Sequence, residues 1–195
     1  MLNRPNYSQD APPLELSIGG VSYAIDADFR TWIAVSELMR EFWTEPGHEI
    51  ENLKNLYEIE TLIFGGRIEQ NVDDAINAIT TFMQGYPEPP TNGYDEPHEP
   101  VVDFAIDLNA IVVAIRDQSG VDLSYRRKEP FHWWLFLLEF RCLAGDHWIT
   151  RLMQIRAYEG DDKEQKKLRY RYALPPRLTP EEREQMDALE SALGD

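Results

Sequence analysis

Histidine and carboxylate side chains at two places along the chain could take part in catalysis or hold a metal ion. Asp103 and Asp107 are four residues apart, and His132, Glu139 and His147 follow further along. General acids, general bases and metal ligands are drawn from these residue types. A hydrolytic site would have to bring together Asp103, Asp107 and His132. A metal site would use His132, Glu139 and His147, or the two aspartates.

The spacing of these residues matches no catalytic or metal-binding motif. The sequence contains no H-E-x-x-H, no pair of histidines four apart, no G-x-S-x-G, no P-loop and no glycine-rich dinucleotide fingerprint. Asp103 and Asp107 are neighbours on one surface of a helix, and we expect them on its solvent-facing side. The sequence therefore predicts a protein that is not an enzyme and has no catalytic, cofactor-binding or metal-binding residues.

Two adjacent tryptophans, Trp133 and Trp134, follow His132 in the most aromatic stretch of the sequence. Exposed tryptophans could stack on a sugar or a base. The segment from Phe131 to Leu138 is apolar nearly all round, however, and a helix of that kind is buried. We therefore expect the tryptophans in the core, with His132 either at the surface or hydrogen-bonded within the fold.

The charge of the chain argues against several classes of partner. The 195 residues carry 35 acidic and 19 basic side chains, a formal net charge of -16. Such a surface repels the phosphates of nucleic acids. No apolar run approaches the roughly 20 residues that span a bilayer, and no signal peptide precedes Pro12. We expect a cytoplasmic protein that binds neither nucleic acid nor membrane.

We expect no chemical role for the single cysteine, and we expect the basic run to be a solvated surface. Cys142 excludes an intrachain disulfide, and we expect it to be a small buried apolar residue. The run from Lys163 to Arg171 could bind an acidic partner or a phosphate, or face the acidic N-terminal half, but charge runs are usually solvated.

Hydrophobic periodicity and turn residues predict a mainly α-helical fold with a short N-terminal β-hairpin. Two alternating segments around Gly19-Gly20 form the hairpin. The expected helices run from a cap at Asp26 or Asp28 to about Trp43, from Gly47 to Gly65, from Asn71 or Asp73 to Gly85, from about Phe104 to Gly120, from Glu129-Pro130 to about Leu143, and from Asp146 to near Gly160. Thr179-Pro180-Glu181-Glu182 predicts a further helix that begins with a capping box.

These elements predict one helical domain with loose or extended segments. Residues 1–13 form a leader, and residues 14–174 form the domain. Residues 86–100 interrupt it as a linker, because five prolines and four acids prevent helix propagation and sheet pairing. Residues 175–195 form a C-terminal helical arm, which either docks on a partner or packs on its own domain.

The order of several motifs resembles a family of small proteins of long-tailed bacteriophages, encoded beside the tape measure protein. The resemblance covers roughly residues 14–176. It is carried by the hairpin leading into Asp28-Phe29-Arg30-Thr31-Trp32, the acidic proline-rich break, Asp103-Phe104-Ala105-Ile106-Asp107, Phe131-His132-Trp133-Trp134-Leu135-Phe136, Met153-Gln154-Ile155-Arg156 and Tyr172-Ala173-Leu174-Pro175.

Members of such families are regarded as tail assembly chaperones. The resemblance implies a non-enzymatic protein that binds the tape measure protein, the tail tube protein or both during tail assembly, with self-association into a homo-oligomer as a further expectation. It implies no catalytic residue and leaves the partner-binding residues unknown. Two alternatives stay open: a structural tail subunit that remains in the virion, and a small helical hydrolase that uses Asp103, Asp107 and His132.

Overall fold

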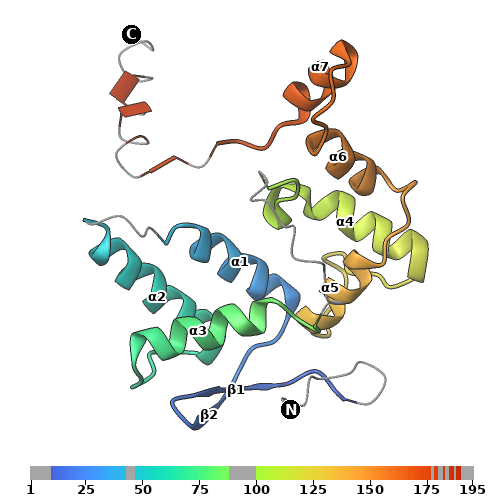
Figure 1. The fold of residues 1–195 in the computed structure, drawn as a ribbon. Coiled ribbons are helices and arrows are strands. Elements are labelled where there is room, and N and C mark those ends of the chain that lie inside the picture. Colours follow the sequence, from blue (N-terminus) through green and yellow to red (C-terminus); the bar gives the residue numbers. More distant parts are fainter. Residues whose placement is uncertain are drawn as a thin grey trace. The chain divides into compact units, whose positions relative to one another are not determined.

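The computed structural model describes residues 10–42, 47–87 and 100–176, together with 178, 179, 182, 185, 186, 188 and 189. Residues 1–9 of the predicted leader, 88–99 of the predicted linker and 190–195 of the predicted arm lie outside this range. Within it, the fold is mainly helical with a two-stranded N-terminal hairpin, as the sequence predicts (Figure 1).

The turn of the N-terminal hairpin lies at Gly19-Gly20, as the sequence predicts. Strand β1 (Glu15–Ile18) pairs antiparallel with β2 (Val21–Ala24), and Ile18 lies opposite Val21. Gly19 and Gly20 have φ angles of 58° and 82°, a combination that residues with a Cβ rarely adopt. The two-residue turn therefore fixes the register of the pair.

Three helices follow the hairpin, each begun or ended by a recognisable signal. Helix α1 (Phe29–Arg40) is capped by Asp28, whose carboxylate accepts from the Arg30 amide. Helix α2 (Glu49–Phe64) ends at Gly65 in the left-handed conformation, and α3 (Val72–Met83) begins at Asn71, which caps two amides. These bounds agree with the predicted ones except at the end of α1, which lies at Arg40, before the expected end near Trp43, a residue outside the described range; Asp28 rather than Asp26 is the first cap.

Four further helices complete the fold; the start of one of them was predicted wrongly, and another was not predicted. They are α4 (Phe104–Ser119), α5 (Trp133–Arg141), α6 (Trp148–Arg156) and α7 (Lys163–Tyr172). Helix α5 begins after His132 and not at Glu129-Pro130. The charged segment after Gly160 is the helix α7, capped by Asp162.

The chain divides into two compact units. The first comprises Met1–His98 and Asp103–Arg151, and the second comprises Glu99–Val102 and Leu152–Asp195. The first unit contains the hairpin, α1 to α5 and the start of α6. The second contains the rest of α6 and α7.

An aromatic cluster fills the core of the first unit. Trp32, Phe29, Trp133 and Phe136 are each at most 1% exposed. Phe29 stacks on Phe136 at 4.9 Å between ring centroids, and Trp32 lies 4.2 Å from Phe82 of α3. Aromatic rings bury a large apolar area each, so this cluster holds α1, α3 and α5 together.

The described part of the predicted C-terminal arm carries its expected cap. The Glu182 amide donates to Thr179 Oγ1 over 3.2 Å, and the Thr179 amide donates to Glu182 Oε2 over 2.8 Å. This reciprocal pair is a capping box. The described residues that follow, 185, 186, 188 and 189, are helical.

Among the described residues, none of the helices combines the length and the apolar character needed to cross a membrane.

Candidate functional site

The two aspartates of the candidate hydrolytic site are buried, which corrects the expectation that they face solvent. Asp103 and Asp107 are 4% and 5% exposed. Asp103 caps α4 by accepting from the amides of Ala105 and Ile106, each over 2.9 Å. Its other oxygen forms an ion pair with Arg40 of α1. The Asp107 carboxylate accepts from the Asp103 amide over 3.0 Å.

The cluster of Asp103, Asp107 and Arg40, here called the carboxylate cluster, consists of two buried carboxylates and a partly exposed guanidinium, and it favours the charged form of Asp103. Burial alone would raise the pKa of Asp103, but the Ile106 amide and the Arg40 guanidinium outweigh it and lower that pKa below its usual value. Nearby Glu37, whose Oε1 lies 3.3 Å from Arg40, has its pKa raised by burial and by the Asp103 charge. The cluster therefore joins α1 to the start of α4.

His132 is hydrogen-bonded within the fold, one of the two positions that the sequence left open. Its Nδ1 accepts from the Trp134 amide over 3.0 Å and so caps α5. Its Nε2 lies 2.8 Å from the Pro13 carbonyl oxygen and donates to it, because Nδ1 is already an acceptor. Both ring nitrogens are engaged, and burial lowers the pKa of His132, so the ring is held neutral.

Protonation of His132 should cost stability as the pH falls. Its pKa in the fold lies below the ordinary 6.5, so the unfolded chain takes up the proton first. The contribution is present above about pH 6.5 and is lost as the pH falls towards the lower folded pKa, because a protonated Nδ1 cannot accept from Trp134. His132→Asn keeps a capping oxygen without the titration. In urea unfolding at pH 7.5 and 5.5, the wild type should lose more stability than this variant as the pH falls; equal losses would contradict the assignment.

The other candidate metal ligands are not brought together. Glu139 lies on α5, and His147 lies before α6, where its carbonyl accepts from the Arg151 amide. Among the described residues, no group of three histidine, cysteine, aspartate or glutamate side chains is placed to hold a metal ion. The candidate set of His132, Glu139 and His147, which the spacing did not support, is not assembled into a metal site among the described residues.

The two tryptophans after His132 are in the core, as predicted, and they also cap the end of α3. Trp134 Nε1 donates to the Phe82 carbonyl over 2.8 Å, and Trp133 Nε1 donates to the Met83 carbonyl over 3.0 Å. Arg141, at the end of α5, donates to the carbonyls of Gln84 and Tyr86. The last carbonyls of a helix have no partner within it, so α5 supplies donors that α3 lacks.

Arg156 has a corresponding role in the second unit. Its Nε donates to the Tyr172 carbonyl over 2.8 Å, and its Nη1 donates to the Val101 carbonyl over 3.0 Å. The side chain thus joins α6 to the end of α7 and to the segment before Asp103. Each of the motifs around Asp103, His132 and Arg156 therefore has a structural role in this molecule.

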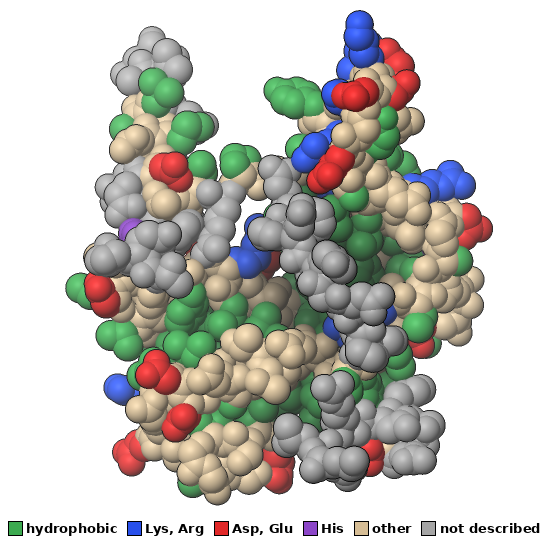
Figure 2. Space-filling model, in the orientation of Figure 1, with side chains coloured by type: hydrophobic (Ala, Val, Ile, Leu, Met, Phe, Trp, Pro, Cys, Tyr) green, Lys and Arg blue, Asp and Glu red, His purple; other side chains and the backbone are tan. Residues whose placement is uncertain are grey.

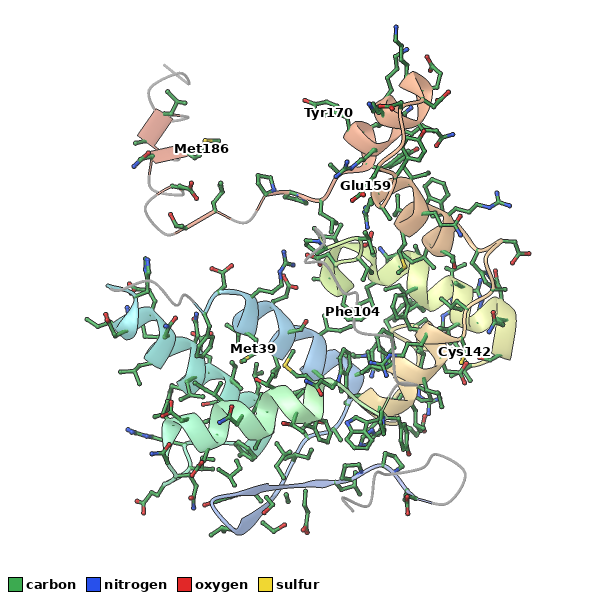
Figure 3. The ribbon with its side chains drawn as sticks, viewed as in Figure 1. Met39, Phe104, Cys142, Glu159, Tyr170 and Met186 are labelled. Carbon is green, nitrogen blue, oxygen red and sulfur yellow. The ribbon has the colours of Figure 1, made fainter. Side chains whose placement is uncertain are left out.

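Cys142 and the basic run lie at the surface. Cys142 is exposed at the end of α5, which corrects the expectation that it is buried (Figure 3). The basic run forms α7, in which no residue is buried, and Tyr170 projects from it with 87% of its surface exposed (Figure 3). Lys166 and Lys167 pair with Asp161 and Glu164 of the same segment, so α7 is the solvated face that charge runs usually form.

Comparison with known proteins identifies the family of this sequence. The family model described as "Bacteriophage Gp15 protein" matches residues 9–174, which is most of the chain. The matched range includes the motifs around Asp103, Trp133-Trp134 and Arg156. No curated protein and no solved structure matches significantly. The chain belongs to the bacteriophage Gp15 protein family.

Proposed function

We propose that this phage protein is a non-enzymatic tail assembly chaperone that binds the tape measure protein, tail tube subunits or both while the tail is built. Its family supports a phage setting. The resemblance of its motifs to tail assembly chaperones supports the role. A chaperone of this kind needs apolar surface for its client and enough charge to keep the complex dispersed.

The observation that carries the proposal is an exposed apolar face on α2. Ile50, Leu53 and Tyr57 are 66%, 56% and 56% exposed, and their spacing of three and four puts them on one side of the helix. We call this face the α2 stripe. Only the later part of α2, from Leu56 to Ile63, contributes buried residues to the core. Apolar side chains grouped on a surface are typical of protein-binding sites.

The surroundings of the α2 stripe are acidic. Residues 1–100 carry 18 acidic and 5 basic side chains, so most of the negative charge lies in the half of the sequence that contains α2. Figure 2 shows acidic side chains scattered over this part of the surface, between apolar and uncharged ones. Like charges on neighbouring molecules repel, which opposes aggregation through the stripe.

The candidate catalytic groups support a non-enzymatic role through what they already bind. Asp103 is held by two amides and Arg40, and His132 uses both ring nitrogens for the fold. A general base must reach the proton that it removes. Side chains committed to helix caps and ion pairs are poorly suited to that task.

Co-expression with the tape measure gene of the same phage should raise the soluble yield of the tape measure protein, and the two should co-purify. Leu53→Ser with Tyr57→Ser should reduce both effects, because the variant makes the α2 stripe polar. The matched control is Ile106→Ser with Val113→Ser, two apolar side chains of α4 that are 53% and 45% exposed. Unchanged yield together with no co-purification by the wild type would count against the proposal.

Mass spectrometry of purified virions separates this role from that of a structural tail subunit. A chaperone should be absent from finished particles, whereas a structural subunit should be present in a fixed ratio to the tail tube protein.

A further inference from the structure

A groove runs between the hairpin and α3 in the first unit. It has a volume of about 960 Å³, near the top of the range of roughly 300–1,000 Å³ for ligand pockets. One wall is the segment from Pro13 to Gly19, and the other is the exposed side of α3 around Asn77, Ala78 and Thr81. The volume of the groove is thus sufficient for a short stretch of polypeptide.

The wall formed by β1 is an open sheet edge. The Ile25 amide donates to the Leu14 carbonyl, so these two residues form a hydrogen-bonded pair. Hydrogen-bonded and non-hydrogen-bonded pairs alternate along an antiparallel ladder. The pairs of Glu15 with Ala24 and of Ser17 with Ser22 are therefore not hydrogen-bonded. The amides and carbonyls of Glu15 and Ser17 therefore point away from β2. In the part of the chain that the structure describes, the sheet has two strands, and α3 packs beside β1. An edge of this kind can accept another strand.

The two ends of the groove differ in chemistry. At the turn end, the Asp74 carboxylate lies beside Gly19, and Glu15 adds a second acid along the wall. At the other end, the rings of Phe82, Tyr86 and Trp134 line the groove, with the Tyr86 and Trp134 rings 4.9 Å apart. Arg141 also lines this end, where its guanidinium donates to the carbonyls of Gln84 and Tyr86. Gly85 belongs to this end; a side chain there would collide with Leu137.

We propose that this groove binds an extended segment of a partner protein, which pairs with the open edge of β1. The segment carries a lysine or arginine that lies beside Asp74 and an apolar side chain that lies against Tyr86 and Trp134. The negative charge of Asp74 at the turn end of the groove and the net charge of -16 of the chain both favour a basic occupant over an acidic one. The identity of the partner as the tape measure protein rests on the proposed function.

Photo-crosslinking in the full-length chain tests the groove directly. The probe is p-benzoylphenylalanine at Asn77, on the groove wall, with the phage tail genes co-expressed. The matched control is the same probe at Asn109, an exposed asparagine of α4 outside the groove. Asn77 should yield a cross-link to one lysine- or arginine-bearing segment, identified by mass spectrometry, that Asn109 does not yield.

Charge reversal at two adjacent aspartates tests the recognition of the basic side chain. Asp74 lines the groove and Asp73 does not, yet both are exposed and lie in the first turn of α3. Asp74→Lys should weaken binding of the cross-linked segment, made as a synthetic peptide, by roughly ten-fold, whereas Asp73→Lys should change it little. Both variants lose the same favourable position near the helix N-terminus, so their folding is affected alike.

A proline at the open edge tests the strand pairing. Ser17→Pro removes an outward-facing amide, which an edge strand tolerates, and Ala24→Pro removes an outward-facing amide on the opposite edge of the hairpin. Ser17→Pro should lower the yield of the Asn77 cross-link at least several-fold, while Ala24→Pro should leave it near the wild-type yield. Thermal unfolding of both variants checks that the hairpin is retained.

The outcomes separate the groove from the proposed function. A cross-link to a basic segment of the tape measure protein supports both. A cross-link to a basic segment of another tail protein supports the groove and counts against the tape measure protein as the partner. Equal cross-links from Asn77 and Asn109, no cross-link, or a cross-link only to copies of this chain overturns the groove, and co-purification with the wild type still decides the proposed function.

Discussion

Replacing Trp133 with alanine should lower the free energy of unfolding by about 3–5 kcal/mol, the usual cost of removing a large aromatic side chain from a core. Trp133 is 1% exposed, stacks on Phe136 at 5.5 Å and meets the edge of Phe104 at 5.5 Å. The substitution also leaves the Met83 carbonyl without its donor. Urea unfolding followed by circular dichroism measures the change.

Two further variants separate packing from hydrogen bonding. Trp133→Phe retains a ring but removes the indole N–H, so it should cost less than alanine, about 1–3 kcal/mol from the unsatisfied carbonyl and the lost volume. Trp148→Ala is the control, because Trp148 is half exposed, and it should cost less than about 1 kcal/mol. A Trp133→Ala variant as stable as Trp148→Ala would show that Trp133 is not part of the core.

The parts of the fold that could be predicted are those with local causes. Gly19-Gly20 determines the hairpin because the turn needs two positive φ angles within two residues. The Asp28 and Asn71 caps each bond to an amide two residues further on. The burial of the tryptophans follows from a helix that is apolar nearly all round.

The parts that were predicted wrongly depend on distant partners or on missing periodicity. Asp103 and Asp107 are polar and four residues apart, a local pattern that indicates a solvent-facing side of a helix. The residue that pairs with Asp103 in the core, Arg40, is 63 positions away in the sequence. Helix α7 has no apolar stripe, so periodicity could not reveal it, although Asp162 is a capping signal in its sequence. His132, which caps α5, is itself held by a contact with the Pro13 carbonyl, 119 positions away.

The candidate site could be predicted even less well, because grooves are made by elements far apart in the sequence. The open edge of β1 follows from the hairpin, which was predicted. Its apposition to α3, Tyr86 and Trp134 depends on tertiary packing that no local signal encodes. The exposure of Ile50 and Leu53 could not be predicted either, because their helical spacing resembles that of buried residues.

Replacing Arg40 with alanine should destabilise the protein by about 2–4 kcal/mol at neutral pH, slightly less than the usual cost of breaking a buried ion pair, because Arg40 itself is 39% exposed. Asp103, whose side chain is 2% exposed, would keep its charge close to Asp107 with no cation beside it. Urea unfolding at several pH values measures both the loss and its pH dependence.

The pH dependence of Arg40→Ala distinguishes electrostatics from lost packing. In the wild type the pKa of Asp103 is lowered, so its contribution is present above the ordinary value of 3.8 and is lost only as the pH falls through the folded value. Without Arg40, the Ile106 and Ala105 amides still lower that pKa, but burial is no longer opposed by the guanidinium, so the pKa should be higher than in the wild type. The stability deficit of the variant should therefore shrink as the pH falls from 7 towards 4. Arg116→Ala is the control: its pair with Asp117 is exposed and should be worth less than about 1 kcal/mol at any pH. A deficit of Arg40→Ala that stays constant with pH would mean that the arginine stabilises α1 and α4 through its aliphatic chain rather than through its charge.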